Sequence, residues 1–387
     1  MSNELRELGD VAAIVMGLSP KGESYNREGV GLPLLNGPTN FGASHPNCTL
    51  YTTDSKRECE RNDLIFCVRG NTTGRMNWAD RKYSLGRGVC GIRAETRRDT
   101  KYIRYCIEAG LPRLLQMAGG STMPTLTQST IKRFQVPYPP HRGKIAAILS
   151  AYDDLIENNL RRIEILEEMA QALYREWFVK FRFPGHESVC MVDSELGMIP
   201  EGWEVLPIGD AVKTLGGGTP STKVPEYWES DGIIWFTPSD LTTSGTMFIE
   251  DSRRRISALG LQKSAARLFP AYSVMMTSRA TIGVTAINTK PACTNQGFIT
   301  CVPNSRISAY QLYFWVQENR EKILSVASGA TYKEINRTEF REFPVAMADR
   351  QINQLLADMT APIGSQIENL LTKNANLRRT RDLPCPG

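Results

Sequence analysis

The feature of this sequence that most restricts its fold is an internal duplication. Near the start of each half, Leu8-Gly9-Asp10 matches Ile208-Gly209-Asp210 at an offset of 200 residues. Further along, Gly74, Gly88, Gly120, Thr122, Phe134 and Val136 match Gly283, Gly297, Gly329, Thr331, Phe343 and Val345 at an offset of 209. A duplicated chain is expected to fold as two units of one architecture. The weak identity of the copies indicates that their surfaces differ.

Each copy is followed by a stretch with coiled-coil spacing. Seam residues recur at alternating steps of four and three over residues 145–177, and the same alternation runs over residues 352–377. So strict a stripe favours a helix-helix seam over a helix lying on its own domain. Asn159 and Gln366 occupy corresponding seam positions, and antiparallel packing would bring them face to face. We therefore predict a polar layer of Asn159 and Gln366 that fixes the register of the two helices.

The remaining patterns predict an α+β fold in both units. Four runs read as strands, over residues 63–69, 88–93, 272–278 and 297–302, and two read as helices, over residues 102–117 and 309–326. The fold class is α+β, with two tandem domains related by a pseudo-twofold axis and separated by two long helices that form an antiparallel coiled coil. The expected boundaries are 1–140, 141–184 for the central helix, 185–345, and 346–387 for the distal helix.

Cysteine, histidine and hydropathy patterns exclude several classes of protein. The nine Cys include no C-x-x-C pair and the three His are isolated, so no metal site is expected. The thiols are expected to be buried and free, as in a reducing cytosol. No apolar run approaches the roughly eighteen residues of a membrane span. We therefore expect a cytoplasmic protein with no membrane partner.

The net charge of +5 is unevenly distributed. Residues 1–140 carry 19 Lys and Arg against 13 Asp and Glu, residues 141–180 carry 6 against 7, and the rest of the chain carries 21 of each. So small a total supplies little counterion release, and nucleic-acid binding would have to rest on local patches or on partners. The commonest explanation of the run Arg253-Arg254-Arg255 is a solvated face, although such a run also suits phosphate contacts.

Three segments resemble catalytic motifs but lack features that those motifs require. Residues 137–140 (PYPP) have the wrong order for the target-binding element of an amino-methyltransferase. The glycine-rich residues 216–223 lack the Gly-Lys-Ser/Thr of a phosphate-binding loop. Asp80-Arg81-Lys82 has no suitable acidic partner for a nuclease site. The sequence therefore predicts no catalytic residue and a protein that is not an enzyme.

Three further segments carry a resemblance to a known family. Residues 173–181 (LYREWFVKF) and 195–204 (ELGMIPEGWE) resemble the central region of the specificity (S) subunits of type I restriction-modification systems. Residues 377–383 (LRRTRDL) are similar to the matching distal region. The resemblance extends over nearly the whole chain and includes the order of its elements.

This resemblance implies a function and a set of partners. Two target recognition domains would each read one half of a bipartite, asymmetric sequence in double-stranded DNA. The helices would recruit two adenine-N6 methyltransferase (M) subunits, and restriction and translocase (R) subunits would join that core. No cofactor is expected in this chain, because S-adenosylmethionine, ATP and Mg²⁺ belong to the partner subunits. Family members usually continue for another helical turn or more beyond residues 377–383, which predicts a second helix shorter than the first.

Candidate DNA-contacting residues follow from the need for hydrogen-bonding side chains on loops that reach a groove. The loops after two of the expected strands meet this need, although ordinary solvated turns would look the same. In the first unit the candidates are Arg69, Asn71, Thr72, Thr73, Arg75, Ser121 and Thr122. In the second unit they are Arg279, Thr281, Thr331, Tyr332 and Lys333.

Two questions remain open at this point. Tyr174, Trp177 and Phe178 form an apolar cluster at one helix end, which suits either partner binding or packing in the core. The chain also suits a second function, that of a coiled-coil scaffold or antirestriction-like adaptor that holds methyltransferase subunits without useful DNA reading. Mapping methylated adenines across a genome separates the two functions, because only a DNA reader specifies a split motif.

Overall fold

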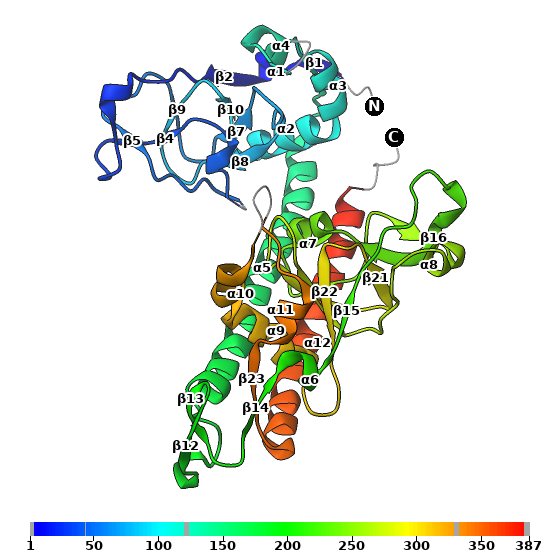
Figure 1. The fold of residues 1–387 in the computed structure, drawn as a ribbon. Helices are drawn as coiled ribbons and strands as arrows, with labels where there is room; N and C mark the ends of the chain where they lie inside the picture. The colour runs from blue at the N-terminus through cyan, green and yellow to red at the C-terminus, as the bar shows by residue number, and fades with distance from the viewer. Residues whose placement is uncertain (1–3, 43, 120–123, 329–332, 383–387) are drawn as a thin grey trace. The chain divides into compact units, whose positions relative to one another are not determined.

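The computed structural model describes residues 4–42, 44–119, 124–328 and 333–382 (Figure 1). Its contacts divide the chain into two compact units that meet between Leu155 and Ile156, within helix α5 (Arg142–Tyr174). Within these ranges, no helix combines the length and apolar character needed to cross a membrane. The same residues contain no group of three or more His, Cys, Asp or Glu that could hold a metal ion.

The first unit is built on an antiparallel four-stranded sheet with the order β2-β10-β7-β8. Its strands are β2 (Ala12–Met16), β7 (Leu64–Cys67), β8 (Met76–Trp78) and β10 (Val89–Ala94). A second sheet has the order β3-β5-β4-β9-β6. Its strands are β3 (Tyr25–Asn26), β4 (Leu32–Leu35), β5 (Tyr51–Thr52), β6 (Glu58–Cys59) and β9 (Tyr83–Leu85). The strands predicted over residues 63–69 and 88–93 are confirmed as β7 and β10.

The second unit repeats the order of the main sheet, as β15-β22-β19-β20, and adds β17 at its edge. These strands are β15 (Lys213–Gly216), β17 (Phe248–Ile249), β19 (Val274–Thr277), β20 (Thr285–Asn288) and β22 (Phe298–Val302). A smaller sheet contains β16 (Trp228–Phe236), β18 (Arg255–Ile256) and β21 (Ala292–Thr294). The duplication inferred from the sequence is therefore a duplication of topology.

One repeated contact explains the most obvious matching motif. Leu8 begins helix α1 (Leu8–Val11), is fully buried, and donates its backbone N–H to the carbonyl of Phe134 at 2.9 Å. Ile208 begins α6 (Ile208–Ala211), is also fully buried, and donates to the carbonyl of Phe343 at 2.8 Å. The Leu/Ile-Gly-Asp motif thus starts a short helix whose first residue anchors the same corner of each domain.

Each of the two helices predicted within the domains is in fact a pair of helices. The first pair is α2 (Arg97–Ala109) and α3 (Leu111–Gln116), and the second is α9 (Ala309–Glu318) and α10 (Arg320–Val326). At the first break, Pro112 lacks the N–H that a continuous helix would use. At the second, the Asn319 side chain donates to the carbonyl of Trp315 at 2.9 Å and so caps the end of α9. Apolar periodicity alone did not separate these short helices.

Within the described residues the second long helix is the shorter one, as expected, because α5 continues into a π-helical segment over Arg175–Val179. Helix α5 has 33 residues and α12 (Arg350–Arg381) has 32. In the second unit, the part of α5 beyond Ile156 runs beside α12 in the opposite direction (Figure 1). Both helices contribute to one apolar cluster with the sheet of that unit. The antiparallel helix pair is therefore part of the second unit's core.

The predicted seam is confirmed on α5 and only partly on α12. Ile156, Ile163 and Ala170 of α5 are buried, as the heptad alternation requires. On α12, however, Met359 is 47% exposed, and Thr360 is buried in its place. The seam shifts because α12 packs on α9 as well as on α5. A sequence stripe does not distinguish two packing partners on one helix.

The polar layer forms with a different partner from the predicted one. The Asn159 amide donates to Oδ1 of Asn374 at 2.8 Å, and Asn374 is 1% exposed. Asn374 Nδ2 in turn lies 3.5 Å from the carbonyl of Ile156. Gln366 is half-buried, one position away from the fully buried Ile367. The prediction of an Asn159–Gln366 layer is therefore wrong because the seam of α12 is displaced.

Most described cysteines are buried free thiols, as expected. Cys59, Cys67, Cys90, Cys293 and Cys301 are buried, and burial raises the pKa of Cys59 to about 12. At that pKa the side chain remains a thiol near neutral pH and is unreactive. Cys48 and Cys106 are partly buried, and Cys190 is exposed.

Candidate nucleic-acid interface

The strand order of the first unit brings three loops to one end of its main sheet. Because neighbouring strands are antiparallel, β2 and β7 end where β10 begins. We call residues 17–21, 69–75 and 85–88 rim 1. Hydrogen bonds join the three segments: Arg87 N–H donates to Ser19 Oγ at 3.3 Å, and Val68 N–H donates to the carbonyl of Gly88 at 3.0 Å.

The second unit has the equivalent edge, where β15 and β19 end and β22 begins. We call residues 217–221, 278–283 and 294–297 rim 2. Gly218 N–H donates to the carbonyl of Thr294 at 2.8 Å, and Ser278 N–H donates to that of Gly297 at 2.8 Å. The same topology therefore presents a second set of loops.

In each rim, a glycine at the matching position allows two loops to approach closely. A Cβ on Gly17 would lie 2.1 Å from the carbonyl oxygen of Gly86, and one on Gly217 would lie 2.0 Å from that of Asn295. Both distances are far below contact, so only glycine lets the end of the first strand approach the neighbouring loop. These repeated glycines therefore serve the backbone of the site.

Rim 1 displays arginines without an acidic partner. Arg69, Asn71 and Arg75 are exposed, and neither arginine forms an ion pair with any residue in the described ranges. The Arg75 guanidinium lies 5.9 Å from the centre of the Phe41 ring, within reach of a cation–π interaction. Free guanidinium groups on a loop are suited to paired hydrogen bonds with base edges or phosphates.

Two of the predicted residues in this loop have a structural part instead. The Thr73 hydroxyl donates to the carbonyls of Gly70 at 2.7 Å and Pro124 at 3.1 Å. Thr72 is half-buried, with its hydroxyl 3.7 Å from the sulfur of Cys67. Their hydroxyl groups shape the turn that presents Arg69, Asn71 and Arg75.

Rim 2 presents an equivalent arginine that is paired with an acidic side chain. Arg69 forms an antiparallel bridge with Thr125, and Arg279 forms the corresponding bridge with Glu334. Across that bridge, Arg279 Nε donates to Glu334 Oε1 at 2.6 Å, with both side chains more than one third exposed. Glu334 therefore neutralises in rim 2 a charge that Thr125 leaves free in rim 1.

The remaining candidates of the two units divide into two groups. Thr281 and Lys333 are exposed, as a contacting residue must be. Four candidates lie outside the described residues: Ser121, Thr122, Thr331 and Tyr332.

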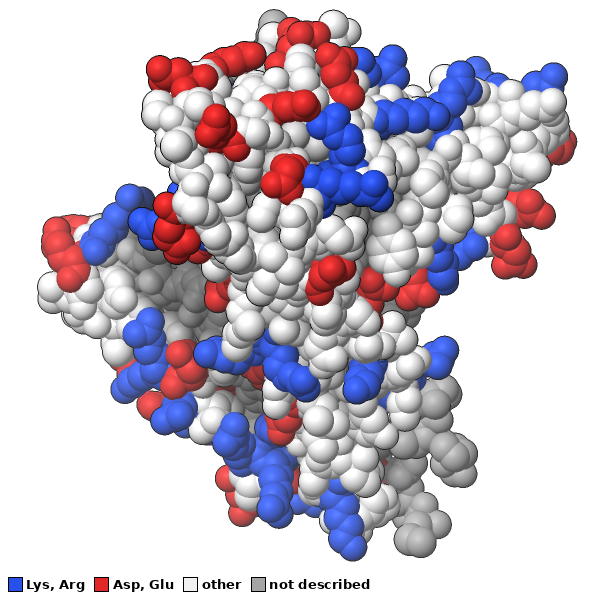
Figure 2. Space-filling model, turned by 90° about the horizontal axis from the view of Figure 1, so that it is seen from below, with Lys and Arg blue, Asp and Glu red and all other residues white. Residues whose placement is uncertain are grey.

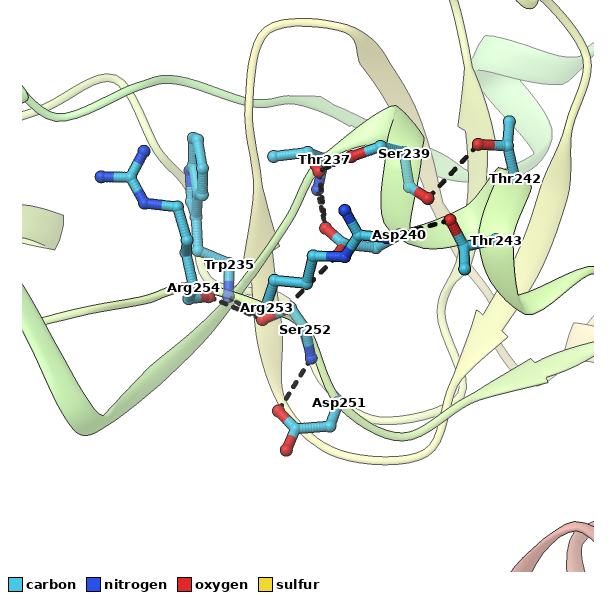
Figure 3. A network of polar contacts seen from close by, with 10 residues as sticks. All are labelled: Trp235, Thr237, Ser239, Asp240, Thr242, Thr243, Asp251, Ser252, Arg253 and Arg254. Atoms are coloured by element: carbon cyan, nitrogen blue, oxygen red, sulfur yellow. Dashed lines mark hydrogen bonds and ion pairs between the residues drawn. The ribbon is translucent and has the colours of Figure 1, made fainter. Parts of the chain in front are cut away.

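A polar network surrounds Arg253 and Arg254 of the second unit (Figure 3). Helix α7 (Pro238–Ser244) begins with a capping box in which Asp240 accepts from Thr237 N–H at 2.8 Å. Asp240 also accepts the backbone N–H of Arg253 at 3.3 Å. Arg255 donates to both carboxylate oxygens of Asp251 at 3.0 Å. Arg253 and Arg255 are thus tied down on either side of Arg254.

Arg254 itself lies on aromatic rings. Its guanidinium carbon is 3.5 Å from the centre of the Trp228 ring and 5.7 Å from that of Trp235. It is exposed and makes no ion pair with a described residue. The sequence displayed the basic run and both tryptophans, but their stacking depends on the pairing of β16 with β18 and was not predictable from spacing.

The aromatic cluster suggested as a partner surface is part of the core. Tyr174, Trp177 and Phe178 are only 4–6% exposed. Tyr174 stacks on Phe178 with ring centres 5.3 Å apart, and Phe178 contacts Trp203 at 5.1 Å. These side chains leave almost no surface for a partner, so core packing is the interpretation that the structure shows.

Acidic side chains dock the second domain onto the helices. Glu167 of α5 accepts the backbone N–H of Met247 at 3.0 Å, and its burial raises the pKa of this carboxyl group above the ordinary value of 4.5. Glu318 of α9 accepts from Gln171 of α5 at 2.8 Å and from Arg175, the first residue after α5, at 2.6 Å. The second domain is therefore positioned on the helix pair by directed hydrogen bonds as well as by apolar packing.

The charge on the molecular surface is mixed. On the face drawn in Figure 2, basic and acidic side chains are interspersed among mostly uncharged residues. That pattern agrees with the small net charge of +5. Binding of a nucleic acid at this charge would rest on individually placed groups such as the rim arginines.

Comparisons with known proteins show the family to which this chain belongs. The profile of the family described as the type I restriction modification DNA specificity domain matches residues 2–168 and again residues 200–379. The chain is 31% identical over 205 residues to the type I restriction enzyme MjaIX specificity subunit of Methanocaldococcus jannaschii. That match covers 52% of this chain and 46% of the relative, so the chain matches about half of the relative's length.

Two further similarities extend over more of the chain. The type I restriction enzyme HindI specificity subunit of Haemophilus influenzae is 22% identical over 334 residues, which cover 71% of this chain and 72% of the relative. The crystal structure of an S subunit from M. genitalium superposes with a TM-score of 0.58 over 98% of this chain and 94% of that chain. At 16% sequence identity, this likeness establishes the fold alone.

Proposed function

Because the chain belongs to the family of type I restriction modification DNA specificity domains, we propose that it recognises a bipartite, asymmetric sequence in double-stranded DNA. Each recognition domain reads one half of that sequence through its rim. The chain is a non-catalytic subunit, and a long helix follows each of its domains in the sequence. The two halves differ in sequence because the two rims differ in their side chains.

The observation that carries this proposal is the pairing of one topology with two surfaces. Both main sheets have the same strand order and the same three loops at one end. Arg69 and Arg279 occupy equivalent bridges, yet their partners, Thr125 and Glu334, are chemically different. Conserved topology with altered side chains is what two readers of unlike half-sites need, because base edges are distinguished by their donors and acceptors.

We further propose that the helices hold two methyltransferase subunits, which restriction subunits then join. Beyond the seam, α5 exposes large apolar side chains on one face at Ile165 and Met169, at 45% and 55% of their surface. Exposed apolar side chains on a helix face support binding of a protein partner. S-adenosylmethionine, ATP and Mg²⁺ are expected on those partners.

Co-expression with a cognate methyltransferase subunit, followed by genome-wide mapping of methylated adenines, tests the proposal. Recognition by two domains gives a motif with two specified halves and an unspecified gap of constant length. A complex that assembles and methylates no defined motif would show instead an adaptor that holds the methyltransferase without reading DNA. Co-purification of the two chains confirms that the complex has formed in either case.

A further inference from the structure

We propose that Arg254, presented on the ring of Trp228, is a DNA-contacting residue of the second recognition domain. This inference rests on the proposed function and extends it to a residue outside the three loops of rim 2. The ligand is a pair of hydrogen-bond acceptors on duplex DNA, which occurs both at the guanine edge in the major groove and on a phosphate group.

Arg254 differs from both of its neighbours in its side-chain contacts. Arg253 directs its guanidinium to the hydroxyl of Thr243 at 3.2 Å and lies 4.0 Å from Asp240. Arg255 bonds both oxygens of Asp251 and the carbonyl of Gly232. Among the residues that the structure describes, Arg254 has no such partner. Two arginines of the run are therefore committed to the fold, and the third is available.

The free arginine is also held in place by a ring contact. Its guanidinium carbon lies 3.5 Å from the centre of the Trp228 ring. Figure 3 shows its side chain alongside Trp235, directed away from Arg253 and Asp240. Stacking of this kind leaves the edge of the guanidinium plane, with its hydrogen-bond donors, open. The side chain therefore loses less conformational entropy on binding than an unsupported arginine.

The two tryptophans beside Arg254 are hydrogen-bonded to rim 2. The Trp228 ring nitrogen donates to the carbonyl of Ser221 at 3.2 Å, and that of Trp235 donates to the carbonyl of Gly218 at 2.9 Å. On the other side of the same loop, Thr219 donates to Gln296 at 2.6 Å. The loop over residues 217–221 thus lies between the tryptophan pair and the rest of rim 2. Arg254 extends that rim by one cationic group.

The test uses the complex of the full chain with its methyltransferase subunit. Binding to duplex DNA that carries the motif of the wild-type complex is measured at several salt concentrations, and methylated adenines are mapped in parallel. Replacement Arg254→Ala is expected to weaken binding about 5-fold to 150-fold. Arg306→Ala is the matched control, because Arg306 is an exposed arginine beyond the opposite end of β22, paired with Glu204 at 2.8 Å.

The replacement Arg254→Lys separates the two sources of the acceptor pair. At a phosphate, lysine keeps most of the affinity, and Arg254→Ala reduces the slope of log K against log salt by about 0.9 without changing the motif. At a guanine, lysine cannot reproduce the paired geometry, and both variants relax the methylated motif at one position of one half. Either pattern supports the assignment.

Equal affinity, salt slope and motif for Arg254→Ala, Arg306→Ala and the wild type would overturn the assignment. If the proposed function itself is wrong, the result is different, because the wild-type complex then methylates no split motif. In that case the non-specific duplex affinity of the full chain is compared, and equal salt slopes for the wild type and Arg254→Ala still refute the DNA contact.

Discussion

The two recognition domains have one topology and differ in how their rim charges are used. In rim 1, Arg69 and Arg75 are free of acidic partners among the described residues, whereas in rim 2 Glu334 binds Arg279. Outside the loops of rim 2, the second domain instead presents Arg254 on a tryptophan. The comparison teaches that duplication preserves the glycines and strand ends that place the loops, while the side chains on those loops diverge. The excess of basic residues over 1–140 therefore reflects uncompensated cations rather than a different fold.

The domains also differ in their relation to the helices. The apolar core of the second unit is continuous with α12 and the second half of α5, and it includes Ile163, Leu356 and Ile367. The first unit has separate apolar clusters built from its own sheets. In that unit, Arg104 bonds Asp153 of α5 at 2.8 Å. The second domain thus shares its stability with the helix pair, and exchanging residues 1–140 leaves that shared core intact.

The largest difference between the rims is expected for Arg69. Replacement Arg69→Ala removes an unpaired guanidinium and should weaken DNA binding by the complex by about 1–3 kcal/mol. Arg279→Ala should cost less, because the wild-type side chain must first leave Glu334. Equilibrium binding at two salt concentrations measures both effects, and equal losses would remove the electrostatic distinction between the rims.

The reverse substitution sharpens the same point. Glu334→Gln releases Arg279 and removes a negative charge from rim 2, so DNA affinity should increase, most strongly at low salt. Thr125→Ser is the matched control in rim 1, because it introduces no charge. An unchanged affinity for Glu334→Gln would place Arg279 away from DNA.

The helix core of the second unit is expected to be sensitive at its polar layer. Asn374→Leu leaves the half-buried amide of Asn159 without its partner and should lower the free energy of unfolding by about 0.5–1.5 kcal/mol. The double variant Asn159→Leu with Asn374→Leu should recover this loss, because both polar groups are removed. Denaturant unfolding of the full chain measures the two values. A single variant as stable as the wild type would show that the layer has no energetic part.

A smaller effect is expected at the tip of the rim 2 turn. Ala280 has a positive φ of 59°, whereas its counterpart in rim 1 is Gly70, with a φ of 87°. A left-handed backbone is unfavourable for alanine, so Ala280→Gly should stabilise the second unit by about 0.5–1 kcal/mol after the entropic cost of glycine. Thermal unfolding measures the change, and Ala327→Gly, at an ordinary φ of −64°, is the control that should destabilise.

The smallest effect concerns pH and the acid that docks only the second domain. Burial raises the pKa of Glu167 in the folded state above its ordinary value of 4.5. Folding is therefore most favourable when this carboxyl group is protonated. This contribution to the free energy of unfolding is fully present below pH 4.5 and is lost as the pH rises through the raised pKa of the folded state. Glu167→Gln should therefore gain stability relative to the wild type over this range and equal it below 4.5. Unfolding midpoints at several pH values test this, and parallel curves for the two proteins would contradict it.

The sequence was sufficient for the repeat, the principal strands and the long helices, because each rests on local spacing or on paired motifs. It was insufficient where two packing partners compete for one helix. The seam of α12 shifts toward α9, so Asn374 rather than Gln366 meets Asn159. The rim residues were predictable as loop residues, but the state of each arginine depends on contacts such as Arg279 with Glu334, which are remote in sequence.

The central claim is that one domain reads one half of the DNA target, and domain exchange tests it most directly. Residues 1–140 are replaced by the corresponding domain of a relative with a different known target, and methylated adenines are mapped for the parent and hybrid complexes. We predict that one half of the motif changes to that of the donor, while the other half remains unchanged. A hybrid that assembles and methylates a motif changed in both halves, or in neither, would contradict the account.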